Sequence, residues 1–280
     1  MAKTWLITGS SRGFGRELAS AVLDAGENLV ATARRPADLD DLVARYGDRV
    51  RAVALDVTDA TAARAAVDTA VREFGRLDVV VNNAGYANSA PIEEMAEDDF
   101  RAQIEANLFG VVNVTRAALP VLRGQRSGHI VQFSSIGGRV GGTPGMGAYQ
   151  TAKFGVEGFS EVLNAEVRPL GIKVVIVEPG PFRTEWSTTS MIRADVGPDY
   201  QRTVGEVNRM REATAASWPG DPARAATIIL DVVAMDDPPL RLLLGASAVE
   251  LALRSAEERS AEARQWAELS GSADYPVGRS

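Results

Sequence analysis

The chain lacks cysteine altogether and has a single histidine, His129, among its 280 residues. The first absence excludes disulfides, thiolate catalysis and cysteine-ligated metal. The second leaves a serine–histidine–acid triad or a histidine-rich metal site dependent on one side chain. His129 opens an apolar segment that we predict to be a strand, and we interpret it as structural. We therefore expect no metal site.

Long apolar runs and a basic surface are also missing. No stretch approaches the roughly 20 apolar residues of a membrane-spanning helix, and too few residues precede the first glycine to form a secretory leader. The net charge of −7 argues against non-specific nucleic-acid binding. We expect a cytoplasmic protein with no membrane or nucleic-acid partner, in which an anionic ligand is held by local groups.

Lysine is the scarcest of the common charged residues. Of the 30 cationic side chains only three are lysines, Lys3, Lys153 and Lys173, and the other 27 are arginines. A lysine inside a candidate site is therefore informative.

Short apolar segments rich in β-branched residues alternate with helical patterns along the chain. Amphipathic helices are predicted at 16–25 and 59–74, and strands at residues 4–8, 28–33, 50–55, 77–81, 129–133, 173–177 and 241–244. Near-continuous apolar strands separated by helices predict a parallel sheet covered on both faces. We predict a doubly wound, Rossmann-type three-layer α/β sandwich with a mostly parallel seven-stranded sheet, as a single domain over residues 1–280.

Two segments break this alternation. Residues 184–220 are a long mixed stretch, which we predict to be a lid over the active site. Residues 255–280 are polar and predict a surface helix followed by a loose terminus. The predicted lid carries apolar side chains at Trp186, Met191, Ile192, Met210 and Trp218. These residues suit either an apolar substrate pocket or a small core beneath the segment.

A glycine-rich turn follows the first predicted strand and opens the first helix. Glycine permits close backbone approach, and a helix N-terminus presents free N–H groups to a pyrophosphate. The spacing is Gly-x-x-x-Gly-x-Gly rather than the common G-x-G-x-x-G, so a tight strand–helix connection is the alternative. The candidate phosphate-binding residues are Gly9, Ser11, Arg12, Gly13, Phe14 and Gly15.

The second predicted strand ends in an arginine pair where an NAD site would carry a carboxylate. An acidic residue there binds the ribose 2′-hydroxyl of NAD, whereas an arginine accommodates the 2′-phosphate of NADP. Arg34 occupies this place, and Arg12 lies in the glycine turn. Two arginines can bind a phosphate with charge-assisted hydrogen bonds. We predict NADP(H), with solvated arginines as the alternative.

Tyr149 and Lys153 are spaced i, i+4 at the start of a predicted helix, so both side chains share one helix face. A tyrosine with a pKa of about 10 is a poor base, and lowering that pKa to about 7 takes about 4 kcal/mol. One ammonium at about 4 Å supplies about that much at an effective dielectric constant of about 20. A serine hydroxyl, from Ser135 in the preceding turn, can bind the substrate oxygen.

Taken in order, these motifs resemble the short-chain dehydrogenase/reductase family, single-domain branch, over about residues 3–245. The matching pieces are Thr8–Gly15, Asp56, Asn82–Gly85, Asn107, Ser135, Tyr149, Lys153 and Pro179–Gly180. The resemblance implies an oxidoreductase acting on CH–OH groups. In it Tyr149 is the general acid/base, Lys153 binds the nicotinamide ribose and lowers the tyrosine pKa, Ser135 orients the substrate oxygen and Asn107 holds a proton-relay water.

The resemblance also implies cofactor contacts beyond the glycine turn. Asp56 is expected to bond the adenine amine, Asn83 and Gly85 to pass close to the adenosine ribose, and Thr184 to touch the nicotinamide amide. The further expected cofactor contacts are Val57, Ala84, Pro179 and Gly180.

One spacing departs from the family pattern. The serine usually lies thirteen residues before the tyrosine; that position is Ile136 here, and Ser135 lies one residue earlier. We assign the role to Ser135, with Ser134 as the alternative. Asn107 carries an alternative too, because a buried helix asparagine can serve only to satisfy neighbouring backbone groups.

The residues from 153 to 161 are similar to those of hydroxysteroid and retinol dehydrogenases, which implies a bulky hydrophobic ketone or secondary alcohol as substrate. The resemblance also implies a homodimer or homotetramer. The rival hypotheses are a non-catalytic NADP-binding regulator and, on the same fold, an acyl-carrier ketoreductase.

Overall fold

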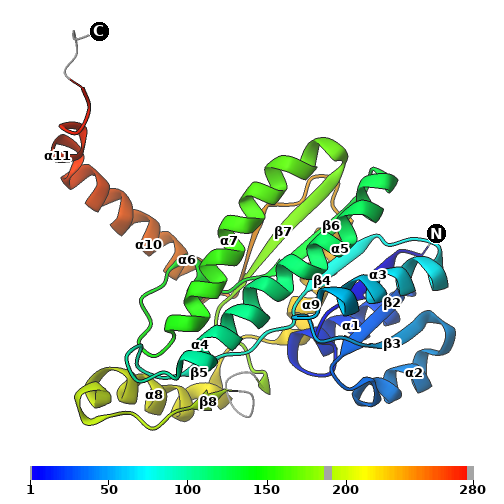
Figure 1. Ribbon diagram of the computed structural model, residues 1–280, viewed down its shortest axis with the longest axis horizontal. Coiled ribbons are helices and arrows are strands. Elements are labelled where there is room, and N and C mark those ends of the chain that lie inside the picture. Colours follow the sequence, from blue (N-terminus) through cyan, green and yellow to red (C-terminus); the bar gives the residue numbers. More distant parts are fainter. Residues whose placement is uncertain (1, 186–190, 276–280) are drawn as a thin grey trace.

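A seven-stranded parallel sheet organises the computed structural model, which describes residues 2–185 and 191–275 (Figure 1). Its strands are β1 (Thr4–Ile7), β2 (Asn28–Ala33), β3 (Val50–Ala54), β4 (Val79–Asn82), β6 (Gly128–Phe133), β7 (Ile172–Pro179) and β9 (Arg241–Leu244). The order is β3-β2-β1-β4-β6-β7-β9, and each neighbouring pair is parallel. A two-stranded sheet joins β5 (Asn88–Ser89) to β8 (Ile192–Arg193).

Helices lie in the connections between the strands, and two more follow the last strand. They are α1 (Gly13–Asp24), α2 (Asp40–Tyr46), α3 (Ala60–Phe74), α4 (Glu97–Ile104), α5 (Gly110–Gln125), α6 (Ile136–Arg139), α7 (Gly147–Val167), α8 (Glu206–Thr214), α9 (Pro222–Ala234), α10 (Ala246–Gln265) and α11 (Ala267–Gly271). The doubly wound three-layer sandwich predicted from the alternating pattern is confirmed.

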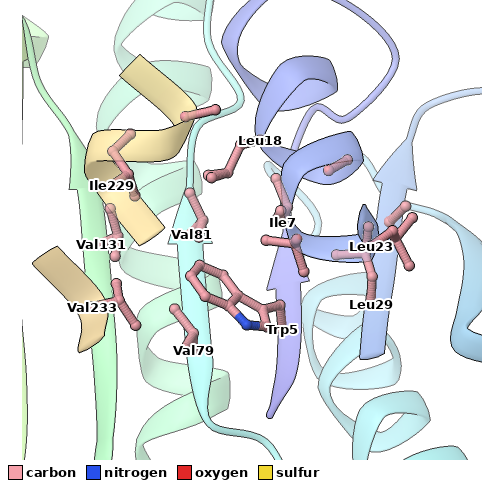
Figure 2. Packing of buried hydrophobic residues seen from close by; sticks show 14 of the residues in the cluster. Trp5, Ile7, Leu18, Leu23, Leu29, Val79, Val81, Val131, Ile229 and Val233 are labelled. Atoms are coloured by element: carbon pink, nitrogen blue, oxygen red, sulfur yellow. The ribbon is translucent and has the colours of Figure 1, made fainter. Parts of the chain in front are cut away.

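Both faces of the sheet are buried. Side chains from α1, α2 and α9 pack on one face, and side chains from α3, α5 and α7 pack on the other. Because successive strand residues point to opposite faces, Trp5 and Ile7 of β1 join the first layer and Leu6 joins the second. Figure 2 shows Trp5 and Ile7 packed with Leu18 of α1 and Ile229 of α9 near the middle of the first layer. Burial on two sides explains why these strands read as continuous apolar runs.

The strand order changes direction between β1 and β4. From β1 the chain builds outward through β2 and β3, and it then returns to β4 on the other side of β1. In open α/β sheets such a switch point leaves a crevice at the carboxyl ends of the strands, where ligands bind.

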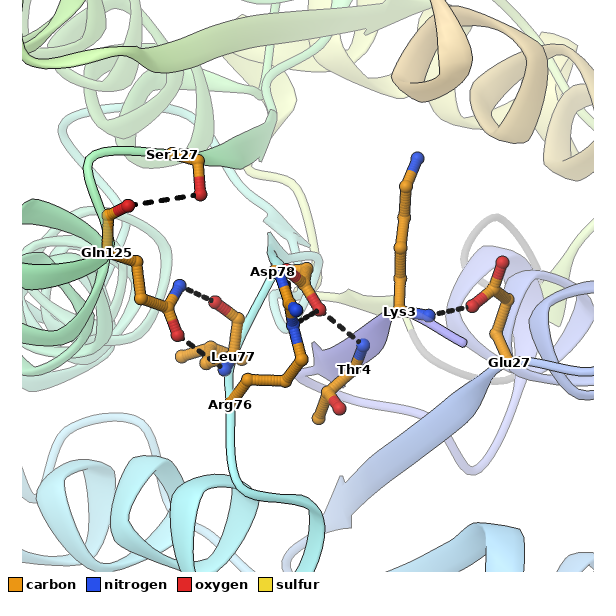
Figure 3. Close-up of polar contacts among 8 residues, drawn as sticks. All are labelled: Lys3, Thr4, Glu27, Arg76, Leu77, Asp78, Gln125 and Ser127. Carbon is orange, nitrogen blue, oxygen red and sulfur yellow. Dashed lines mark hydrogen bonds and ion pairs between the residues drawn. The ribbon is translucent and has the colours of Figure 1, made fainter. Parts of the chain in front are cut away.

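The opposite, amino edge of the sheet is closed by polar side chains (Figure 3). The Asp78 carboxylate accepts hydrogen bonds from the Thr4 amide at 2.8 Å and from Arg76 Nε at 2.8 Å. The Gln125 side chain donates to the Leu77 carbonyl and accepts from the Leu77 amide. The Leu77 backbone is thus paired by a side chain, and β4 begins at Val79, two residues later than predicted.

The predicted lid is partly helical. After β8 come a 3₁₀ turn at Pro198–Tyr200, a π-helical turn at Gln201–Gly205, and α8. Trp186 lies outside the described residues. Within the segment predicted as a surface helix and a loose terminus, residues 255–265 form the outer part of α10, whose base is buried at Ala248 and Ala252, and α11 follows. The last five residues of the predicted terminus lie outside the described residues. The rest of α10 extends away from the sheet (Figure 1). Among the described residues no helix is both long and apolar enough to cross a membrane.

Candidate functional site

A cavity of about 1590 Å³ opens at the carboxyl edge of the sheet, over the switch point. It gathers nearly all the residues that the sequence singled out from distant parts of the chain. These are Gly9, Ser11, Arg12, Gly13, Phe14, Arg34, Asp56, Val57, Asn83, Ala84, Gly85, Asn107, Ser135, Tyr149, Lys153, Pro179, Gly180 and Thr184. Gly15 alone of the predicted site residues does not line the cavity.

The glycine turn is shaped by close backbone contacts. Gly9 has a φ of +69°, and a Cβ there would lie 3.0 Å from the Cα of Ala84. Gly15 is buried, and a Cβ there would overlap the Gly9 carbonyl and the Asn83 amide group. Gly15 therefore acts by packing. The N-terminus of α1 carries no side-chain cap, so its free N–H groups and the glycine cradle fit a pyrophosphate.

Asn83 holds this turn in place. Its Nδ2 donates to the carbonyls of Thr8 at 2.9 Å and Gly9 at 3.1 Å, while the Thr8 hydroxyl accepts from the amides of Asn83 and Ala84 at 3.0 Å each. The side-chain Nδ2 of Asn83 is thus occupied by hydrogen bonds to the backbone of the turn. Asn83 would therefore contact a ribose through its backbone atoms.

The segment after β7 closes over the turn. The Phe182 and Phe14 rings lie 4.9 Å apart, and a Cβ at Gly13 would lie 3.7 Å from Thr184 Cβ and from a carboxylate oxygen of Glu185. Thr184 is therefore positioned directly opposite the N-terminus of α1.

The ends of β2 and β3 form the far end of the cavity. Arg12 and Arg34 are exposed there, and within the described residues neither forms an ion pair. Sequence reasoning missed a carboxylate at this end, Asp38, which pairs with Arg35 at 3.1 Å.

Hydrogen bonds from the amide and hydroxyl of Thr58, with a smaller contribution from the charge of Arg34, lower the pKa of Asp56.

Tyr149 and Lys153 lie on one face of α7, with the Lys153 Nζ 5.7 Å from the centre of the Tyr149 ring. Nζ donates a hydrogen bond to the carbonyl of Phe133, at the end of β6, at 2.7 Å. Burial lowers the pKa of Lys153 to about 8, against the opposing charge of Glu157.

The phenol is less acidic in the protein alone than the sequence predicts. Burial raises the pKa of Tyr149 to about 12, and the Ser135 hydrogen bond and the positive charge of Arg211 offset only part of that rise. The difference arises because the sequence argument counted the attraction of one ammonium but not the removal of the phenolate from water.

The two candidate serines behave differently. Ser135 caps α6, accepting from the Gly137 amide at 3.0 Å, and it also hydrogen-bonds Tyr149. The Ser134 Oγ is buried beneath Gly138 and has no hydrogen-bond partner within the described part of the chain. Only the Ser135 hydroxyl reaches the phenol.

Asn107 lies in a π-helical turn, Glu105–Phe109, between α4 and α5. Its Nδ2 donates to the carbonyls of Tyr86 at 2.9 Å and Gln103 at 2.8 Å, and its Oδ1 accepts from the Tyr86 amide at 3.1 Å. The side chain thus satisfies neighbouring backbone, as the structural alternative predicts. A π-helical turn is nevertheless frequent at functional sites.

Comparison with known proteins accounts for this arrangement. Residues 3–193 match the family model described as short chain dehydrogenase. The chain belongs to the short-chain dehydrogenase/reductase family, and it is an oxidoreductase of that family.

Members of the family resemble the chain over nearly its full length. A protein named Oxidoreductase BOA17 from Botryotinia fuckeliana is 51% identical, with 96% of this chain and 98% of that protein covered. A 3-ketodihydrosphingosine reductase from Bacteroides thetaiotaomicron is 36% identical over 86% of this chain and 87% of its own length. The crystal structure of a short-chain dehydrogenase from Streptomyces avermitilis, 40% identical, superposes with a TM-score of 0.91 over 98% of this chain and all of that one.

Some apolar side chains of the predicted lid line the cavity, and one is buried in a small core. Ile192, Met210 and Trp218 line the cavity, as the pocket alternative predicts. Met191 instead packs in a small buried cluster with Ala87, Met146 and Tyr149, as the core alternative predicts.

Several cavity-lining residues escaped the sequence analysis, because no motif marks them. They include Tyr86, Asn88, Met146, Gln150, Arg211 and Thr214. The one histidine lies at the amino edge, where burial, with the charges of Lys173 and Lys3, lowers the pKa of His129 to about 4. In the described part of the chain, no cluster of histidine and acidic side chains could hold a metal ion.

Proposed function

We propose that the chain is an NADP(H)-dependent oxidoreductase that transfers a hydride between the nicotinamide and a ketone or secondary alcohol. The observation that carries this proposal is the convergence of Ser135, Tyr149 and Lys153 in the cavity that the glycine turn also lines. The glycine turn, Ser135 and the start of α7 line one cavity. A bound cofactor, a hydroxyl that orients the substrate oxygen and a proton donor would then lie close together, as the reduction of a carbonyl requires.

The chain's own residues take separable roles. Tyr149 protonates the carbonyl oxygen during reduction and removes the hydroxyl proton during oxidation. Ser135, already hydrogen-bonded to that phenol, orients the substrate oxygen. Lys153 binds the nicotinamide ribose and stabilises the phenolate, and Asn107 supports the proton relay behind it. The bound nicotinamide supplies the hydride chemistry.

The preference for NADP(H) rests on charge at the adenosine end. Arg12 and Arg34 both line the cavity, and a guanidinium pair suits a 2′-phosphate. The nearby carboxylate of Asp38 is neutralised by Arg35, so it competes weakly for a ribose hydroxyl.

The substrate is a bulky, largely hydrophobic ketone or alcohol. The lid contributes Ile192, Met210 and Trp218 to the cavity wall, and Met146 lines it from the start of α7. The relative from Bacteroides thetaiotaomicron is named a 3-ketodihydrosphingosine reductase, which favours a ketone substrate here. As for many family members, we expect the working unit to be a homodimer or homotetramer.

Replacing Tyr149 tests the proposal. Tyr149→Phe should abolish NADPH oxidation on a panel of hydrophobic ketones while leaving NADPH affinity nearly unchanged, because the phenol oxygen is the proton donor. Tyr46→Phe is the matched control, since the Tyr46 hydroxyl bonds Asp24 at 2.6 Å at the C-terminal end of α1, and neither residue lines the cavity. A Tyr149→Phe enzyme that keeps most of its rate would refute the assignment. NADPH binding without turnover of any ketone by the unmodified protein would favour the non-catalytic regulator.

A further inference from the structure

One cation in the cavity has no role in the chemistry proposed above. Arg211 of α8 lines the cavity near Tyr149, and its charge acts on the phenol. Its Nη1 is buried without a hydrogen-bond partner, and within the described ranges its guanidinium forms no ion pair. Burial lowers the pKa of Arg211, and the charge of Arg193 acts in the same direction.

A half-buried guanidinium without an anion is unfavourable. Buried charges in proteins are normally paired and hydrogen-bonded, and a missing partner costs a large part of the desolvation penalty. The adjacent carboxylate on α8, Glu212, lies 3.6 Å from Arg193 instead. Arg211 is thus held beside the reacting phenol while the protein's own acid pairs elsewhere.

The position of Arg211 separates it from the cofactor phosphates. The glycine turn lies between β1 and α1, and the 2′-phosphate end is formed by the end of β2. Arg211 belongs to the lid, one residue after Met210 and one helical turn before Thr214, all three of which line the cavity. Its neighbours along the wall are therefore those of the substrate.

We propose that Arg211 binds a carboxylate carried by the substrate, so that the preferred ketone is an amphipathic keto acid with a hydrophobic body. This inference rests on the proposed function and narrows its substrate class. A guanidinium offers two parallel N–H donors that match a carboxylate, and such charge-assisted pairs are strong when solvent is excluded. The apolar wall of Met210 and Trp218 accommodates the body of the molecule, and Arg211 fixes its acidic end.

Matched acids and esters test the inference. The probes are acetylbenzoate, benzoylpropionate and benzoylbutyrate, which place the carboxylate at graded distances from the ketone, each beside its methyl ester. The unmodified enzyme should reduce at least one acid with a higher kcat/KM than its ester. Arg211→Gln should lower the ratio of kcat/KM for that acid to kcat/KM for its ester by about 10- to 100-fold, because a charge-assisted hydrogen bond contributes roughly that factor. The ratio removes the effect that the charge of Arg211 has on the phenol, which both substrates share.

Two variants complete the design. Arg211→Lys should retain part of the preference for the acid, since it keeps the charge but not the paired donors. Arg209→Gln is the matched control, because Arg209 is exposed on the same helix and bonds Gln201. It should leave the ratio of acid to ester unchanged.

The inference fails if Arg211→Gln slows acid and ester equally and shifts both pH–rate profiles, because Arg211 then acts only on the phenol. It also fails if every ester is preferred to its acid. Turnover of neutral ketones without an acid preference overturns the inference and leaves the proposed function intact. If no ketone is turned over, the proposed function fails, and calorimetric binding of benzoylpropionate to the NADPH-loaded protein and to its Arg211→Gln variant then decides the inference.

Discussion

Replacing Lys153 by methionine should slow alcohol oxidation by raising the pKa of the catalytic phenol. Methionine has nearly the length of lysine and fits a buried position, but it removes the ammonium that lies 5.7 Å from the Tyr149 ring centre. It also removes the hydrogen bond from Nζ to the Phe133 carbonyl. The perturbation is thus mainly the loss of one buried charge.

The expected size follows from that distance. With the 5.7 Å between Nζ and the ring centre taken as the distance between the ammonium and the phenolate charge, the two interact with about 3 kcal/mol at an effective dielectric constant of about 20. This energy equals about two pKa units. Because burial already raises the pKa of Tyr149 to about 12, losing a further two units of stabilisation should cut the reactive phenolate, and with it the oxidation rate, about 100-fold.

The assay is the initial rate of NADP⁺ reduction with phenylethanol at saturating cofactor, followed across pH. The comparison belongs below about pH 8, where Lys153 keeps its charge, since burial lowers the pKa of Lys153 to about 8. Lys173→Met is the matched control, because the Lys173 Nζ is exposed and bonds the Met235 carbonyl away from the cavity. Below pH 8 the Lys153→Met rate should rise with pH at the same slope as that of the unmodified enzyme but lie about 100-fold lower.

A different profile would refute this reasoning. If the rate of Lys153→Met at saturating cofactor is less than about threefold below that of the unmodified enzyme across this pH range, the lysine does not tune the phenol. A raised KM for NADP⁺ with an unchanged kcat would lead to the same conclusion.

Four further changes test separate parts of the structure. Ser135→Ala should lower kcat for ketone reduction by about 100-fold, as loss of one donor to the reacting oxygen does, whereas Ser134→Ala should change it little; equal losses would disprove the assignment. Arg34→Asp should move the ratio of kcat/KM values from NADPH toward NADH, and an unchanged ratio would place the phosphate elsewhere. Gly15→Ala should lower the free energy of unfolding in urea by about 1–3 kcal/mol through overpacking. His129→Gln should flatten the loss of unfolding free energy as pH falls from 6.5 toward about 4, because the folded state keeps this imidazole neutral while the unfolded chain protonates it.

Features governed by local spacing could be predicted from the sequence. The i, i+4 relation of Tyr149 and Lys153 needs only a helix, and the strand pattern needs only alternating burial. The approach of the glycine turn to Asn83 followed from the rule that ligand sites gather at the carboxyl ends of parallel strands. These arguments depend on neighbours in the chain or on fold-level geometry.

Features governed by tertiary contact could not be predicted. No sequence motif identifies Arg211, because only the packing of α8 in the folded protein brings its guanidinium into the cavity wall. The raised pKa of Tyr149 depends on its burial, to which Ala87 and Met191 contribute from distant parts of the chain. The pairing of Asp38 with Arg35 depends on how the chain turns after β2. Each outcome is set by residues far away in sequence or by the path of an irregular segment.

The lid is anchored to the loop that follows β4, and this bears on specificity. β8 pairs with β5, and the Ser89 hydroxyl donates to the Asn208 side chain in α8 across a buried contact of 2.7 Å. Asn88 also accepts from the Ile192 amide and donates to Asp99 at 2.6 Å. Since α8 carries Arg211, these bonds hold the proposed substrate-binding cation in place relative to the loop after β4. The two proposals together assign hydride chemistry to Ser135, Tyr149 and Lys153 and substrate choice to α8, so exchange of α8 between relatives should alter which ketone is reduced without altering how it is reduced.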